Sequence, residues 1–173
     1  MIVDGHLELA FDAVINGRNL HQPLQSLRSR EKGRHPAGVA TLTLPALQEA
    51  GVSLVFGTIF AQPALRHTAE IGYHNPAQAH QMAMTQLDYY HRLADEDETI
   101  RLVRTPAELT AVTESLAGER PYLGIVPLLK GADPIRQPEE LELWVERGVC
   151  IVGLAWDDTA YASGFQSGSR FGL

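Results

Sequence analysis

The chain has 173 residues, 45% hydrophobic and 20% charged, which is typical of a globular domain rather than a disordered or fibrous chain. Its formal net charge of -7 argues against a general nucleic-acid-binding protein, because such proteins usually carry a basic stripe. No apolar run of about 18 residues is present, so we expect no transmembrane helix.

The start of the chain lacks the basic region and apolar stretch of a signal peptide. The single cysteine, Cys150, cannot form an internal disulfide and fits a reducing compartment. We therefore expect a cytoplasmic protein.

Four short apolar runs predict strands, at residues 2–3, 52–60, 122–129 and 149–156. Continuous apolar runs of this length are typical of strands buried on both faces, as in parallel sheets. The last run contains Cys150, which we expect to be a buried thiol.

Helical patterns lie between these runs, and the expected helices begin near residues 44, 75, 105 and 138. Asn75 can cap one helix, with Pro76 at its first position. Thr105 and Glu108 form the pattern of a capping box at the start of another. The last helix is expected to turn three side chains inward, namely Leu141, Trp144 and Val145. Residues 22–39 form either an exposed loop or a short helix over 23–30 followed by a loop.

Alternation of strands and helices predicts right-handed βαβ units and a parallel sheet. Two architectures remain open, a doubly wound sheet and part of a (β/α)8 barrel. No Gly-x-Gly-x-x-Gly follows a strand, which removes the main support for dinucleotide binding. In a barrel the active site lies at the carboxyl ends of the strands. The polar residues expected at those ends are His6, Glu8, Thr58, Lys130, Asp133, Asp157 and Asp158.

Three of these strand ends are candidate sites, and each has a plainer alternative. His6 and Glu8 are two apart on a strand and share a face, so they could bind one zinc ion or form a polar pair at the strand end. Lys130 directly follows an apolar run, and it could act in a site, extend its ammonium to solvent at the strand end, or pair with Asp133. Asp157 could face a site or belong to a turn.

Several of these segments resemble one family of enzymes. Residues 4–9 (DGHLEL) resemble the opening Asp-Gly-His-x-Asp-Leu of the membrane (renal) dipeptidase family, peptidase family M19 of the amidohydrolase superfamily. Residues 128–135 (LLKGADPI) resemble its Glu-Gly-Ala-Asp segment, and residues 141–164 its following helix and strand. The resemblance covers essentially the whole chain and is closer to bacterial members than to the renal enzyme.

The resemblance implies a (β/α)8 metallohydrolase that binds two zinc ions and hydrolyses dipeptides with a metal-activated water. It implies that His6 and Glu8 hold one zinc, that Lys130 stands at the position of the bridging glutamate, and that Trp156 and Asp157 lie on the substrate side. It further implies a homo-oligomer for a complete chain.

The sequence departs from the family pattern at three points. Glu8 replaces an aspartate, Lys130 replaces the bridging glutamate, and the later histidines of the second zinc site do not occur. Lys130 could bridge two metals only if it were carboxylated. An unmodified ammonium there repels metal and could pair with Glu8 instead.

These departures leave two main readings of the function. The first is a zinc-dependent dipeptidase, and the alternative is a non-catalytic relative with a binding or assembly role. An unrelated small α/β binding protein is a third class. Because a (β/α)8 barrel takes about 250 residues, we expect residues 1–173 to form one incomplete domain, the N-terminal half of such a barrel. Its open sheet edges are expected to favour self-association.

Overall fold

The computed structural model describes residues 1–33, 35–64, 71–155 and 159–162, and it contains a parallel sheet. The strands are β1 (Ile2–Leu7), β2 (Val52–Phe60), β3 (Ile100–Leu102), β4 (Leu123–Lys130) and β5 (Ile151–Gly153). Their order is β1-β2-β4-β3, and β5 also pairs with β4. The expected α/β half-barrel with parallel strands is confirmed.

The strand β3 was not predicted from the sequence. It pairs with the first half of β4, while β5 pairs with the second half of the same β4 edge. Each of these two strands has three residues. Three residues are too few for an apolar run to stand out, so only the neighbouring strand reveals that β3 belongs to the sheet.

The helices that the structure describes are α1 (Leu9–Val14), α2 (Leu24–Glu31), α3 (Leu44–Glu49), α4 (Pro76–Glu96), α5 (Pro106–Ser115) and α6 (Leu141–Glu146). A short 3-10 helix (Pro138–Glu140) precedes α6. The helix α2 decides between the two readings of residues 22–39 in favour of a short helix. The helix α1 was not predicted, because neither a capping side chain nor a proline marks its start directly after β1.

Both predicted caps are present. The Asn75 side chain accepts a hydrogen bond of 3.0 Å from the backbone N–H of Gln78. The Thr105 hydroxyl accepts from the N–H of Glu108 at 3.2 Å, and the Glu108 carboxylate accepts from the N–H of Thr105 at 2.9 Å. These local interactions need no tertiary partner, which explains why the sequence alone located both helix starts.

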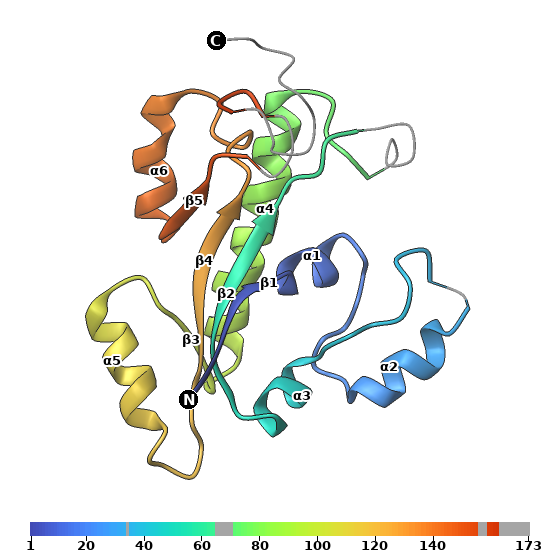
Figure 1. The fold of residues 1–173 in the computed structure, drawn as a ribbon, viewed down its shortest axis with the longest axis vertical. Coiled ribbons are helices and arrows are strands. Elements are labelled where there is room, and N and C mark those ends of the chain that lie inside the picture. Colours follow the sequence, from blue (N-terminus) through green and yellow to red (C-terminus); the bar gives the residue numbers. More distant parts are fainter. Residues whose placement is uncertain (34, 65–70, 156–158, 163–173) are drawn as a thin grey trace.

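The main core lies between the sheet and α4, which runs along one face of the sheet with α1–α3 on one side and α5 and α6 on the other (Figure 1). The side chains of Val55 in β2, Ile125 in β4 and Tyr90 in α4 are fully buried there. Gly57 makes this close packing possible, since an added Cβ would lie 2.6 Å from Ile125 Cγ2 and 2.9 Å from Tyr90 Cζ. None of the described helices is long and apolar enough to cross a membrane.

Two expectations about burial near the end of the chain are wrong. Trp144 of α6 is fully buried as expected, but Leu141 and Val145 are 44% and 60% exposed. The helix α6 lies beside β5 at the border of the sheet (Figure 1). Trp144 is the residue of α6 that is buried there. Cys150 is exposed and precedes β5, with its Sγ 3.4 Å from the carbonyl oxygen of Gly148.

Candidate functional site

An ion pair joins the carboxyl ends of two strands. The Lys130 Nζ, at the end of β4, lies 2.5 Å from the Glu8 Oε1, directly after β1. The Lys130 side chain is 10% exposed and that of Glu8 is 37% exposed. Parallel strands bring their carboxyl ends to one edge of the sheet, so residues 122 positions apart meet there.

The Phe60 ring is a second neighbour of the Lys130 ammonium, beside the Glu8 carboxylate. Phe60 is the register partner of Lys130 on β2, and its ring centroid lies 4.6 Å from the Nζ. An ammonium over an aromatic face is attracted by the negative face of the ring. Lys130 is therefore held by a carboxylate and an aromatic face, rather than by Asp133 as one reading of the sequence proposed.

The end of β2 is held by Gln86 of α4, a residue that the sequence analysis missed. The Gln86 side chain is fully buried, accepts a hydrogen bond of 3.0 Å from the Phe60 N–H, and donates one of 2.7 Å to the Phe60 carbonyl oxygen. Both backbone groups of Phe60 are thus bound by one amide. The available signal was a glutamine within the otherwise apolar face of the 75–95 helix.

Tyr90 of α4 connects the start of α1 to the last residues of β2. Its hydroxyl donates to the Thr58 carbonyl oxygen at 2.9 Å and accepts from the Ala10 N–H at 3.2 Å. The Thr58 hydroxyl donates to the Leu7 carbonyl oxygen at 3.2 Å, next to Glu8. Burial raises the pKa of the Tyr90 hydroxyl far above its ordinary range, so this donor stays protonated.

His6 is exposed on β1, and its backbone N–H donates to the Asp4 carboxylate at 2.9 Å. Among the residues that the structure describes, no hydrogen bond or ion pair joins the His6 side chain to Glu8 or Lys130. Nor does any group of three or more His, Cys, Asp or Glu side chains in this part of the chain come together to hold a metal ion. The structure thus joins Glu8 to Lys130 by an ion pair, and the shared role of His6 and Glu8 in binding a metal stays a prediction.

Asp133 connects the segments that follow β2, β4 and β5. Its carboxylate accepts hydrogen bonds from the Tyr73 hydroxyl and, at 2.8 Å, from the Ala160 N–H. The Tyr161 hydroxyl donates to the Ile135 carbonyl oxygen at 2.5 Å. Burial, together with the Asp133 carboxylate, raises the pKa of the Tyr73 hydroxyl. Asp133 thus holds together the loops around the carboxyl ends of the strands, which we call the strand-end face. Its position in the sequence did not indicate this role.

The substrate-side candidates Trp156 and Asp157 lie outside the described residues. They stay predictions of the sequence.

The described strand-end residues do not fit a divalent metal ion. The Glu8 carboxylate is already bound to the Lys130 ammonium, which lies where a cation on Glu8 Oε1 would sit. Two unit charges 4 Å apart repel each other by about 4 kcal/mol at an effective dielectric constant near 20.

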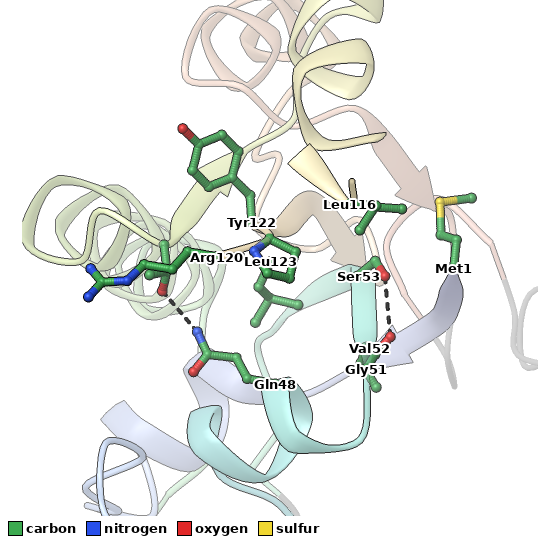
Figure 2. Close-up of a pocket in the computed structure, with 11 residues that line it drawn as sticks. Met1, Gln48, Gly51, Val52, Ser53, Leu116, Arg120, Tyr122 and Leu123 are labelled. Carbon is green, nitrogen blue, oxygen red and sulfur yellow. Dashed lines mark hydrogen bonds between the residues drawn. The ribbon is translucent and has the colours of Figure 1, made fainter. Parts of the chain in front are cut away.

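A cavity of about 540 Å³ lies at the opposite end of the sheet, near the amino ends of β2 and β4. Figure 2 shows Gln48, Ser53, Arg120 and Tyr122 around it. Barrel enzymes carry their chemistry at the carboxyl ends of the strands, whereas the amino ends serve stability. We therefore place the candidate site at Glu8 and Lys130 rather than at this cavity.

Parallel strands with helices between them, and polar side chains at the carboxyl ends, define an α/β half-barrel of the kind found in (β/α)8 enzymes. Two solved structures that are similar to this chain carry dipeptidase names. The chain is similar to the probable dipeptidase PvdM from Pseudomonas aeruginosa, with 13% identity, a TM-score of 0.66, and coverage of 91% of this chain and 35% of that one. It is also similar to dipeptidase AC, a metallopeptidase of family M19, with 17% identity, a TM-score of 0.63, and coverage of 90% and 44%.

At these identities the likeness shows the fold, and it confirms at that level the resemblance to M19 dipeptidases. The chain spans 35% and 44% of the lengths of these two structures. Neither a protein-family model nor a curated protein matches the chain.

Proposed function

We propose that the chain forms half of a dipeptidase-type (β/α)8 domain, and that the strand-end face around Glu8 and Lys130 takes dipeptides. The observation that carries this proposal is the Glu8–Lys130 pair, which places opposite charges at the catalytic edge of this fold. A free dipeptide carries an ammonium and a carboxylate. Lys130 contacts Glu8 through Oε1, and the 37% exposed Glu8 side chain offers its other carboxylate oxygen as a hydrogen-bond acceptor to the singly charged ammonium of the dipeptide.

Two outcomes for a bound dipeptide are supported by different observations. Metal-dependent hydrolysis is supported by the names of the two similar structures, a probable dipeptidase and a dipeptidase that is a metallopeptidase. Zinc, with His6 and Glu8 as its ligands, is what the sequence resemblance implies. Binding without hydrolysis is supported by the ammonium beside Glu8, which does not fit a divalent metal. We propose the second, a non-catalytic peptide-binding relative, because it rests on the residues of this chain.

The experiment measures dipeptide binding and hydrolysis separately on the full-length protein. Isothermal titration calorimetry with a panel of dipeptides tests binding, and mass spectrometry of released amino acids tests hydrolysis. We expect binding of free dipeptides, binding weaker by about tenfold after N-acetylation removes the ammonium, and no release of amino acids.

Absence of binding by every dipeptide would overturn the ligand class. Release of amino acids that stops on addition of a chelator would instead establish the zinc-dependent dipeptidase. An unchanged affinity after N-acetylation would show that Glu8 does not bind the ammonium of the dipeptide.

A further inference from the structure

We infer that the Lys130 ammonium is a built-in cation of the strand-end site, which neutralises Glu8 and keeps divalent metal ions from binding there. The inference rests on the same strand-end face as the proposed function and deepens it. The positive charge at this face is then supplied by a side chain of the protein and not by a bound metal ion.

Burial sets Lys130 apart from the only other lysine in the chain. Lys32 is exposed, whereas the Lys130 side chain is 10% exposed. A buried ammonium is costly unless it is paired and hydrogen-bonded. The 2.5 Å contact with Glu8 and the Phe60 ring supply that pairing, which indicates a charge held in place rather than a side chain reaching for solvent.

The backbone of Lys130 is fixed on both sides. Its strand β4 lies inside the sheet, where Lys130 is the register partner of Phe60 on β2 and of Gly153 on β5. The end of β2 is in turn bound by Gln86 through both backbone groups of Phe60. With the backbone fixed, the burial of the side chain and its contacts with Glu8 and Phe60 hold the ammonium against displacement by a cation that approaches Glu8.

The net charge of the Glu8–Lys130 pair predicts the affinity of the site for divalent metal ions. Glu8 and Lys130 together are neutral, so a divalent cation gains little from the carboxylate and is repelled by the ammonium. When the ammonium is removed, the partly buried Glu8 carboxylate lacks a counter-charge. The same position should then attract a divalent cation.

The experiment measures Zn²⁺ affinity of the full-length protein by competition with a chromophoric chelator. Lys130→Met removes the charge with little change in side-chain length, and Lys32→Met is the matched control for loss of a lysine. We expect Lys130→Met to bind Zn²⁺ at least about tenfold more tightly than the wild-type protein, and Lys32→Met to match the wild type. Adding Glu8→Gln to Lys130→Met should remove the gain.

Tight stoichiometric Zn²⁺ binding by the wild-type protein that is lost in Glu8→Gln would overturn the inference. So would the absence of any gain in a folded Lys130→Met variant. Dipeptide binding is measured by the separate calorimetric titration, which is repeated in the presence of a chelator so that metal binding does not affect it. A failure of the metal inference is thus distinguishable from a failure of the proposed function.

A second measurement needs no variant at Lys130. Acylation of amines with a water-soluble ester, followed by peptide mass spectrometry, should label Lys32 about tenfold faster than Lys130. Glu8→Gln should raise the labelling of Lys130. Equal labelling of the two lysines, or a carbamate signal at Lys130 after incubation with ¹³C-bicarbonate, would contradict the presence of a buried ammonium.

Discussion

Arg18 and Glu31 form a buried ion pair that binds α2 to the turn after α1. The Arg18 Nε donates to the Glu31 Oε1 at 2.9 Å, and the Ala40 N–H donates to the Glu31 Oε2 at 2.6 Å. The Arg18 Nη1 also donates to the Asp12 carboxylate at 2.6 Å. Burial opposes ionisation of Glu31, but the hydrogen bonds from Arg18 and Ala40 outweigh it and lower the pKa of the carboxyl.

This pair predicts a loss of stability in acid. The pKa of Glu31 is lower in the folded protein than its ordinary value of 4.5, so its contribution is present above about pH 4.5 and is lost as the pH falls through the folded pKa. Glu31→Gln should lower the free energy of unfolding at pH 7 by about 3 kcal/mol, since it leaves Arg18 buried without its partner. Below pH 4.5 the stability of the variant should fall less steeply than that of the wild type.

Urea unfolding at pH 7 and at several acidic pH values measures both effects. Glu114→Gln, at an exposed position on α5, is the control and should behave as the wild type. An equal loss of stability at every pH would show that Glu31 contributes by packing rather than by charge.

Among the helices, α4 organises the strand-end site. It buries seven residues, including Gln86 and Tyr90, and these two bind the backbone of β2 at Phe60 and Thr58. The start of α4 follows from local chemistry at Asn75. Its docking does not, because the hydrogen-bonding partners of Gln86 and Tyr90 lie at the end of a distant strand.

Removal of the Tyr90 hydroxyl tests this docking. Tyr90→Phe keeps the ring but leaves the Ala10 N–H and one acceptor position of the Thr58 carbonyl unpaired in the core. We expect the free energy of unfolding to fall by about 1–3 kcal/mol. The measurement is chemical denaturation followed by circular dichroism, with Tyr89→Phe as the neighbouring control, which should lose clearly less. Equal losses in the two variants would contradict the bridging role of Tyr90.

On the scale of the whole molecule, the described part of the chain leaves apolar surface uncovered. Leu141, Leu154 and Tyr161 are 44%, 59% and 37% exposed, and they line one apolar cavity of about 240 Å³ beside β5. At the other border of the sheet, β1 pairs with β2 alone and exposes Ile2 and Val3. Exposed edges and apolar patches of this kind favour association with another chain.

We therefore expect the protein to self-associate at concentrations of about 10–100 µM. Leu154→Asp should shift the equilibrium toward the monomer, because it places a charge within the apolar cavity beside β5. Sedimentation velocity over a concentration series measures the shift. Leu109→Asp, at an exposed apolar position on α5, is the control. A wild-type protein that stays monomeric over this range would refute the expectation.

The sequence by itself determined the class of the fold and most of its elements. Buried apolar runs at 52–60 and 122–129, and caps at Asn75 and Thr105, are local signals that act without distant partners. The same pattern placed Lys130 and Glu8 at strand ends, because parallel strands share one carboxyl edge. The strand β3 escaped detection because three residues show no period, and helix α1 because no capping side chain or proline marks its start.

Only the tertiary structure decided which charges meet. Lys130 could have paired with Asp133, three residues away, yet it binds Glu8 at the end of another strand, while Asp133 binds Tyr73 and Ala160. The roles of Gln86 and the exposure of Val145 were likewise decided by what lies next to them in space. Pairing and burial depend on sheet register and helix docking, which bring distant segments together, and a sequence pattern carries little information about them.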